Sequence, residues 1–343
     1  MNTLSNNGQT SSTTTQLAKE QWLVHDIPQD CGLLPTIGVL FWIGWLGILP
    51  WLFVLTFLFG SFQALQLVLA TCILSLILPR YFLGDLGMKI GDWLVWHGAK
   101  YFGLKTTIED PKALLELSRQ QKTPIFSLEP HHLLPFSAVA FHPVLKRIPG
   151  YTNCCVLISS AIFQVPFMRQ VFSWTHGFSA DKKTFRSLLK KKRPPVLIPG
   201  GVHEVTLMDP LHPDHLTLYL NKRKGFIKLA LENGSPIVPA FSFHLDECYG
   251  FWLPSGKLYS NFARILGFAP VFFWGRHGIP LGLPKPKKVH VVIGSPIDVP
   301  HEGEFVKEES IEKYHKVFLI ELTSLYERHK HTEGYGNKTL IIT

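Results

Sequence analysis

The sequence predicts an α/β domain preceded by an apolar hairpin, and two observations carry this prediction. From residue 84 onward, short runs of β-branched and aromatic residues alternate with helical patterns, as in domains built around a largely parallel sheet. Before that point, no charged side chain occurs between Cys31 and Pro79, and an uncharged stretch of this length is typical of a membrane segment. We therefore expect a hairpin over residues 31–79 and one α/β domain over residues 84–343.

The N-terminal tail, residues 1–20, is rich in Ser, Thr, Asn and Gln. It does not show the basic start and short apolar core of a signal peptide. A segment with so few apolar residues cannot bury enough surface to offset the entropy of ordering it. We expect this tail to be disordered.

Within the hairpin, a turn near Gly60 is expected to join two helical legs, Leu33–Phe59 and Phe62–Leu78. Each leg is about long enough for a bilayer core, where the backbone must satisfy its own hydrogen bonds as a helix. Both ends of a hairpin leave the membrane on one side, and the basic residues of the domain favour the cytosol. Because Gly44 and Pro50 weaken the first leg, a hairpin that re-enters without crossing is an alternative.

Charge and cysteine content narrow the class of protein. The chain has 34 Lys and Arg against 25 Asp and Glu, a formal net charge of +9. This excess fits a domain held against anionic membrane lipids, or the binding of a substrate that carries phosphates. No nucleic-acid module accompanies it, so nucleic acid is not expected as a partner. The five cysteines lack CxxC and metal-type spacing, which predicts reduced thiols and no metal site.

Strand and helix patterns follow one another along the domain. The predicted strands are Pro124–Leu128, Cys154–Ile158, Pro195–Pro199, Pro236–Phe243 and Val289–Ile293. The predicted helices lie around 110–120, 132–141, 159–172, 181–192, 223–233 and 306–330. Ligands of open α/β sheets bind beyond the carboxyl ends of the strands, so a site is expected directly after one or more of these strands.

Two strand ends carry residues suited to catalysis. The first strand runs into Glu-Pro-His-His at 129–132, and the third runs into Pro-Gly-Gly-Val-His-Glu at 199–204. An imidazole is the usual base for taking a proton from an alcohol near neutral pH, and paired glycines let backbone amides approach an oxyanion or a phosphate. Each motif alone is more often a plain turn, and most of the 16 histidines are expected at surface or packing positions. The order of the motifs is more specific than either one.

EPHH at 129–132, PGGVHE at 199–204, RKGFIKLA at 223–230 and GRHG at 275–278 follow one another along the chain. In this order they resemble the blocks of the type 2 diacylglycerol O-acyltransferase family, which also contains monoacylglycerol and wax-alcohol acyltransferases. The resemblance runs from the hairpin to the last residue. EPHH is closer to the EPHS of plant and algal members than to the HPHG of animal and fungal members. A glycerolipid-acyltransferase-like αβ domain on a two-helix membrane hairpin is what the resemblance implies.

The resemblance also implies an activity and a location. The protein would be an enzyme of the endoplasmic reticulum membrane, with its catalytic domain facing the cytosol and lipid droplets as a second location. It would move a fatty acyl group from acyl-CoA, a co-substrate, to diacylglycerol, without a bound cofactor. Monoacylglycerol and long-chain alcohols are rival acceptors. A non-catalytic lipid-droplet protein is the less favoured alternative, and homo-oligomer formation is left open.

Individual roles follow from the same resemblance. His131, the residue after the proline, is expected to act as the base that activates the acceptor hydroxyl. Either Glu204 or Glu129 would hold its imidazole in the productive tautomer, and the amides of Gly200 and Gly201 would stabilise the oxyanion. The sequence has no G-x-S-x-G nucleophile elbow, so direct transfer is expected rather than a covalent acyl-enzyme or an esterase reaction.

Two further expectations concern binding. Arg223 and Lys224, beside the glycine of the RKGF block, are expected to contact the phosphates of CoA, since Arg suits bidentate phosphate contacts. Solvated or headgroup-facing charge is the more common role of such pairs. The aromatic segment 262–274 is expected to lie at the membrane surface.

Three positions depart from the family pattern. His132 stands where relatives carry Ser or Gly. Phe136 and Ser137 stand where the H-x-x-x-x-D pattern of phospholipid acyltransferases has its Asp, so a His/Asp pair from neighbouring sequence cannot be assumed. The block that reads SFGEN in relatives is SFHLDE at 242–247 and has lost a glycine.

Overall fold

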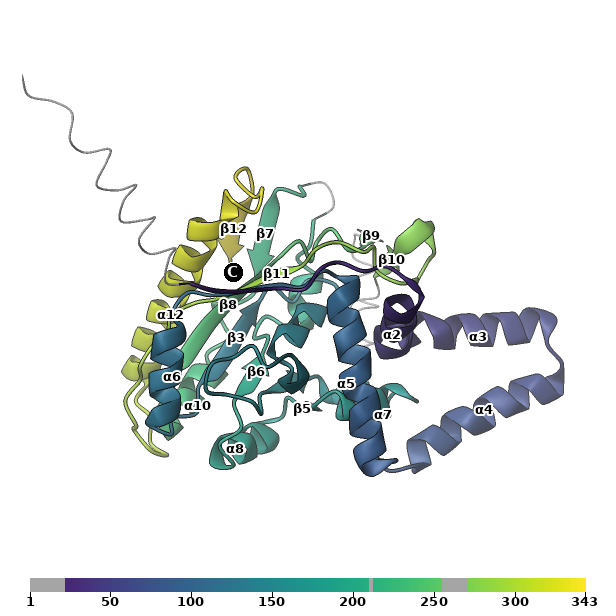
Figure 1. Cartoon of the computed structure of the whole chain (residues 1–343), viewed down its shortest axis with the longest axis horizontal. Coiled ribbons are helices and arrows are strands. Elements are labelled where there is room, and N and C mark those ends of the chain that lie inside the picture. The colour runs from purple at the N-terminus through teal and green to yellow at the C-terminus, as the bar shows by residue number, and fades with distance from the viewer. Residues whose placement is uncertain (1–21, 210–211, 255–270) are drawn as a thin grey trace, which may run out of the picture.

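The computed structural model describes residues 22–209, 212–254 and 271–343 (Figure 1). The tail expected to be disordered lies outside these ranges, as does most of the aromatic segment 262–274. The described residues form a central sheet of eight strands and two small sheets of two strands each.

The central sheet has the strand order β1-β2-β11-β8-β3-β6-β4-β5. From β8 to β5 the strands run parallel, whereas β11 is antiparallel to β8 and β1 is antiparallel to β2. The bounds are β1 Leu23–Asp26, β2 Lys105–Ile108, β3 Ile125–Glu129, β4 Cys155–Ile158, β5 Gly177–Ser179, β6 Pro195–Leu197, β8 Ile237–Phe243 and β11 His290–Ile293. The largely parallel sheet is therefore confirmed, and the five predicted strands correspond to β3, β4, β6, β8 and β11.

The small sheets lie beside the carboxyl edge of the central one. In the first, β7 (His215–Leu218) pairs in parallel with β12 (Thr339–Ile342), which brings the C-terminal residues next to the middle of the chain (Figure 1). In the second, β9 (Gly250–Trp252) pairs antiparallel with β10 (Phe272–Trp274). These strands have only three or four residues each, and the sequence patterns did not indicate them.

Alternate residues of the central strands face opposite sides of the sheet, and each side has its own hydrophobic core. On β11, Val291 and Ile293 belong to one core and Val292 to the other. The first core is covered by α5 (Gly84–Tyr101), α6 (Pro111–Arg119) and the 3₁₀ helix η1 (Phe136–Phe141). The second is covered by α8 (Lys182–Lys190), α10 (Gly225–Asn233) and α12 (Glu308–Lys330). A parallel sheet buried on both faces is the architecture that βα alternation requires.

Four of the six predicted helices are confirmed, as α6, α8, α10 and α12. The helix expected around 132–141 is wrong, because Pro135 and Pro143 confine the segment to the short 3₁₀ helix η1. The helix expected around 159–172 is also wrong, since Pro166 divides it into η3 (Ser160–Gln164) and α7 (Met168–Trp174). Helix α5 was not predicted, because the glycines in its sequence are unusual inside a helix. The structure shows why they are there: Gly91 lies directly against the backbone of α7.

The first leg of the hairpin is broken rather than straight. Helices α2 (Leu33–Ile43) and α3 (Trp45–Phe59) meet at Gly44 with a bend of 81°. Helix α2 packs against α5 so closely that a Cβ at Gly38 would lie 2.6 Å from that of His97. The single helix expected over Leu33–Phe59 is therefore wrong, and α2 belongs to the packed domain.

Helices α3 and α4 (Phe62–Ile77) extend from the domain as two arms (Figure 1). Large apolar side chains on them are exposed, among them Phe57, Phe59, Phe62 and Ile77, each more than 70% exposed. Among the described residues, no single helix is long and apolar enough to cross a membrane. The bent pair α2 and α3 meets that test together, by length and composition, and α4 is a shorter apolar helix.

Candidate active site

The turns that follow β3 and β6 meet at one edge of the sheet, because these strands are parallel neighbours. Strand β3 ends at the fully buried Glu129, and the chain passes through a cis peptide bond to Pro130 and on to His131 and His132. Strand β6 is followed by the one-turn helix α9 (Val202–Val205), which carries Glu204. The backbone N–H of His131 donates a hydrogen bond of 2.7 Å to Oε2 of Glu204. The two motifs expected to form one site are in contact.

The imidazole of His131 is oriented by the backbone. Its Nδ1 lies 2.7 Å from the carbonyl oxygen of His132, which can only accept, so Nδ1 carries the proton. The lone pair of the neutral ring is then on Nε2, which has no hydrogen-bond partner within the described ranges. Burial lowers the pKa of His131, which keeps the ring neutral near pH 7. A neutral ring with a free Nε2 is the form that a general base requires.

Glu204 holds the backbone rather than an imidazole. Besides the N–H of His131, it accepts the N–H of Tyr219 at 3.1 Å through Oε1. The residue is 2% exposed, and burial raises the pKa of Glu204 to about 7. The expectation that Glu204 or Glu129 orients the ring of His131 is therefore wrong, since the His132 carbonyl does so. Glu204 instead ties the turn after β3 to the segment after β7.

Glu129 is the most deeply buried of the candidate residues. Burial first, and then the neighbouring carboxyl of Glu204, raise the pKa of Glu129 well above its usual value. Two carboxyl groups in such a site do not both ionise. Both effects favour the neutral form of Glu129, whose two carboxyl oxygens are buried without a hydrogen-bond partner among the described residues.

The two glycines are needed by the shape of the turn after β6. Gly201 has a φ of 58°, in the left-handed region that favours glycine. A Cβ at Gly200 would collide with the carboxyl group of Glu204. Glycine is therefore required at both positions, by the contact with Glu204 at the first and by the backbone conformation at the second.

Arg223 and Lys224 lie in different surroundings. The guanidinium of Arg223 lies at the site, with Nη2 3.4 Å from the carbonyl oxygen of Gly200 and Cζ 4.9 Å from the ring centroid of Tyr219. Lys224 instead forms an ion pair with Glu312 on α12. The structure brings Arg223 to the predicted turn but not Lys224.

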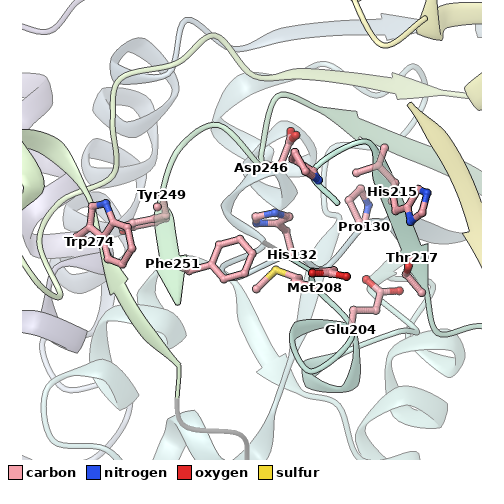
Figure 2. Close-up of a pocket in the computed structure, with 14 residues that line it drawn as sticks. Pro130, His132, Glu204, Met208, His215, Thr217, Asp246, Tyr249, Phe251 and Trp274 are labelled. Carbon is pink, nitrogen blue, oxygen red and sulfur yellow. The ribbon is translucent and has the colours of Figure 1, made fainter. Parts of the chain in front are cut away.

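A cavity of about 270 Å³ lies beside these turns (Figure 2). Its polar wall includes His132, Glu204 and Asp246, and its aromatic wall consists of Tyr249, Phe251 and Trp274. Burial lowers the pKa of His132 to about 4, so this second imidazole is also neutral. It is the ring of His132, and not that of His131, that lines the cavity, edge-on to Phe251 at a centroid distance of 6.2 Å.

Sequence reasoning missed most of the cavity wall. His132 was noted only as a departure from the family pattern, and the three aromatic residues belong to β9, β10 and the segment before them. Asp246 lies in the SFHLDE block, whose altered sequence was the one available signal. Residues that meet only through folding share no spacing along the chain.

A second polar cluster, Asp92, His142 and His176, has metal-ligand atoms within 4.8 Å of one another. Nδ1 of His142 accepts the N–H of Val144 at 3.2 Å, so the proton of the neutral ring is on Nε2, 3.8 Å from Oδ1 of Asp92. A protonated Nε2 offers no lone pair to a metal ion. We read the cluster as a polar contact between α5 and the segments that follow η1 and α7.

Comparison with known proteins places the chain in a family. A model of the diacylglycerol acyltransferase family matches residues 63–343. A 2-acylglycerol O-acyltransferase 1 from Bos taurus is 31% identical over 276 residues, which cover 74% of this chain and 77% of the relative. An acyl-CoA wax alcohol acyltransferase 1 from Homo sapiens is 30% identical over 257 residues, 70% of this chain and 75% of the relative.

Two further similarities complete the comparison. A diacylglycerol O-acyltransferase 2 from Dictyostelium discoideum is 30% identical over 227 residues, 62% of this chain and 67% of the relative. The solved 1-acyl-sn-glycerophosphate acyltransferase PlsC from Thermotoga maritima aligns over 85% of this chain and 96% of its own, with 12% identity and a TM-score of 0.39. On the family match and the identities of its relatives, this chain belongs to the diacylglycerol acyltransferase family.

Proposed function

We propose that this protein transfers a fatty acyl group from acyl-CoA to diacylglycerol, forming triacylglycerol, at the cytosolic face of the endoplasmic reticulum membrane. Family membership supports acyl-CoA-dependent transfer to a lipid hydroxyl. The observation that carries the mechanism is the state of His131: its Nδ1 proton is held by the His132 carbonyl, which leaves a lone pair on Nε2. An alcohol that binds at this nitrogen can lose its proton as it attacks.

The proposed reaction is a single direct transfer. Nε2 of His131 removes the proton of the acceptor hydroxyl while the hydroxyl oxygen attacks the thioester carbonyl carbon. Negative charge develops on the carbonyl oxygen, where the amides of Gly200 and Gly201 would donate hydrogen bonds. The carbon–sulfur bond then breaks, and the departing CoA thiolate takes the proton from the His131 imidazolium. An ester and free CoA result, and the base returns to its neutral form.

Arg223 is the residue we propose for a phosphate of CoA. Its guanidinium lies beside the Gly200 carbonyl, and its Nε is buried without a hydrogen-bond partner in the part of the chain described. An anion would satisfy that donor. Lys224 stays a weaker candidate, because a phosphate would have to replace Glu312 as its partner.

The membrane arrangement is part of the same proposal. Residues 84–343 would form the catalytic domain together with β1 and α2, which precede them in the chain and pack into it. The exposed apolar side chains of α3 and α4 would embed in the bilayer. Lipid droplets are a second location, because the same hairpin suits a lipid monolayer if it re-enters without crossing.

The acceptor distinguishes the proposed function from its rivals. Relatives at similar identity are named for 2-acylglycerol and for wax alcohols, so both are alternatives to diacylglycerol. Expression in cells that lack neutral-lipid synthesis, with each acceptor supplied in turn, tests them directly. Triacylglycerol made by the wild type and not by His131→Ala supports the proposal. Wax ester as the sole product, or droplet association without any acylated product, would replace it.

A further inference from the structure

Asp246 lies in the altered SFHLDE block, in the loop that connects β8 to β9. It lines the cavity together with His132, although the two residues are more than a hundred positions apart. The cavity has a further acidic residue in Asp209 and another in Glu204. Asp246 and Asp209 are paired with Lys338 and His212, so the wall carries little free charge. Its aromatic side, formed by Tyr249, Phe251 and Trp274, suits the uncharged hydroxyl and ester groups of a lipid acceptor better than the phosphates of CoA. We therefore treat this cavity as the acceptor side of the site.

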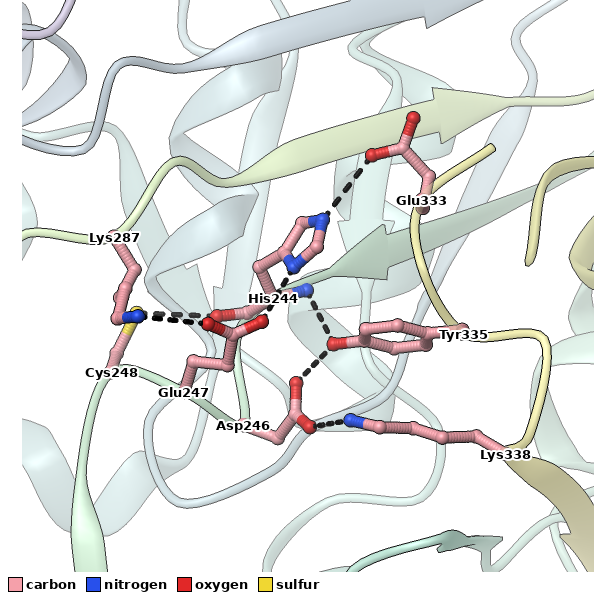
Figure 3. Close-up of polar contacts among 8 residues, drawn as sticks. All are labelled: His244, Asp246, Glu247, Cys248, Lys287, Glu333, Tyr335 and Lys338. Atoms are coloured by element: carbon pink, nitrogen blue, oxygen red, sulfur yellow. Dashed lines mark hydrogen bonds and ion pairs between the residues drawn. The ribbon is translucent and has the colours of Figure 1, made fainter. Parts of the chain in front are cut away.

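The C-terminal segment holds the carboxylate of Asp246 in place (Figure 3). The hydroxyl of Tyr335 donates to Oδ1, and the ammonium of Lys338 pairs with Oδ2. Tyr335 is 3% exposed, and its oxygen accepts the backbone N–H of His244 at 2.7 Å, so its hydroxyl proton is directed at Asp246. Both oxygens of Asp246 are thus fixed by residues from the end of the chain.

The same segment supports an unusual backbone at His244. This residue has a φ of 66°, where the corresponding family block has its glycine. Its ring lies between two carboxylates, with Nδ1 2.7 Å from Glu247 and Nε2 3.3 Å from Glu333. The loop that carries Asp246 is therefore built for rigidity, at the cost of a strained position.

The charge of Asp246 acts on His132. Burial alone would raise the pKa of Asp246, but the ammonium of Lys338 and the hydroxyl of Tyr335 hold it below its usual value, so the group is anionic. Its charge opposes the effect of burial on His132, although no direct hydrogen bond joins the two within the described residues. Asp246 is thus an anionic group in the wall of the cavity that His132 also lines, whereas positions 136 and 137, near the histidines in sequence, carry no carboxylate.

We propose that His132 binds the acceptor lipid through its imidazole and that Asp246, held by Tyr335 and Lys338, is the positioning residue that sets this contact. His131 and His132 then have separate roles. His131 takes the proton of the acceptor hydroxyl, and His132 holds the glycerol oxygens of the same lipid. The inference rests on the proposed transferase function. It predicts that the pair controls acceptor binding and leaves the chemical step to His131.

Steady-state kinetics of full-length protein in detergent–lipid micelles test the inference, with acyl-CoA and diacylglycerol varied separately. We expect Asp246→Asn and His132→Ala each to raise the KM for diacylglycerol about tenfold, with kcat and the KM for acyl-CoA changed less than about twofold. Because Asp246 acts through His132, the double variant should resemble the single ones instead of multiplying their effects. Tyr335→Phe should shift the same KM by a smaller factor.

Glu247→Gln is the matched control. It breaks contacts to His244 and Lys287 in the same loop without removing a charge from the cavity. An equal rise in the acceptor KM for this variant would show that loop rigidity alone matters, and would overturn the inference. A fall in kcat at constant KM for Asp246→Asn, or multiplicative effects in the double variant, would overturn it as well.

A readout without turnover separates this inference from the proposed function. Labelling by a photoreactive diacylglycerol should be strong for the wild type and for His131→Ala, and weak for Asp246→Asn. A wild type that is labelled but makes no ester would refute the transferase proposal and leave the acceptor site standing. Equal labelling of Asp246→Asn and wild type, with equal melting temperatures, would refute the site.

Discussion

At the scale of single residues, two adjacent imidazoles have different surroundings. His131 donates from Nδ1 to a backbone carbonyl and keeps Nε2 unprotonated, whereas His132 lies in the cavity wall with its pKa lowered to about 4. The backbone changes direction at His132, which has a φ of 47° in the left-handed region, so the two adjacent rings enter different surroundings.

His131→Ala should therefore remove transfer activity, by a factor of about 10² to 10⁴, since that is the usual contribution of a general base. His132→Ala should keep kcat within a small factor and act on acceptor binding. Both variants should fold, because neither ring contributes to the two hydrophobic cores. Acylation assays at saturating acceptor check the prediction, and the reverse pattern would make His132 the base.

Glu204 leads to a prediction about stability. Its pKa is raised to about 7 from an ordinary value of 4.5, so the folded protein binds this proton more tightly than the unfolded chain. The contribution of this proton to the free energy of unfolding is complete below pH 4.5 and is lost as the pH rises towards 7. In Glu204→Gln the side chain cannot titrate, and its amide N–H₂ would face one of the two backbone N–H groups that the carboxylate accepts. The loss of this hydrogen bond lowers the free energy of unfolding by roughly 1–3 kcal/mol.

Thermal unfolding of wild type and Glu204→Gln at pH 5 and pH 7.5 checks this prediction. The variant should melt lower than the wild type at both values and show the smaller difference between them. An identical pH dependence in the two proteins would mean that Glu204 does not titrate in this range.

At the scale of elements, the last strand completes the cavity. Strand β12 pairs with β7, and β7 contributes Leu216 and Thr217 to the cavity wall. The carbonyl of Thr343 also accepts the N–H groups of Leu220 and Asn221, next to the Tyr219 amide that Glu204 binds. The end of the chain is thus linked to the catalytic turn through one short segment.

Removal of residues 339–343 should abolish most transfer activity while membrane association stays unchanged. Strand β7 would lose its only partner strand among the described residues and, with it, the position of the Tyr219 amide. Activity and membrane fractionation of the truncated protein check this outcome. Substitution of Thr339, at the exposed start of β12, by Ser keeps the strand and should leave activity intact.

At the scale of the whole molecule, the two apolar arms contact the domain only near their bases, where Trp51 donates to the carbonyl of Pro280 and Ser75 bonds to Gln170 among the described residues. Helix α2 packs into the domain through Val39 and Trp42, whereas α3 and α4 expose most of their apolar surface. A deletion meant to remove the anchor should therefore spare α2.

Replacing residues 52–71 by a Gly/Ser linker should abolish tight membrane insertion, and it keeps the contacts of Trp51 and Ser75 with the domain, which should still bind anionic vesicles at low salt. Headgroup attraction provides only about 1 kcal/mol per basic residue and is screened by salt. Carbonate extraction decides the matter. Full-length protein that washes off at high pH would show that the arms are not embedded, and resistance of the deleted form would reveal a second embedded segment.

The sequence by itself determined the features that depend on local pattern: the apolar N-terminal region, the buried central strands and the two turn motifs at the strand ends. Period-two alternation and long uncharged runs are properties of neighbouring residues, so they are readable before folding. The meeting of EPHH with PGGVHE was also predictable, because parallel neighbours place their carboxyl ends together.

Only the tertiary structure decided which groups contact one another. Nothing in the spacing of His131, His132 and Glu204 indicates that a backbone carbonyl orients the ring while the carboxylate holds an amide. The sequence indicates Gly44 as a weak point of the first leg, but the glycines of α5 became part of a helix because they let it pack closely, as where Gly91 lies against the backbone of α7. Asp246 joins the site because the loop after β8 and the C-terminal segment fold onto each other, and hydrogen bonds between segments so distant in sequence leave no pattern in either one.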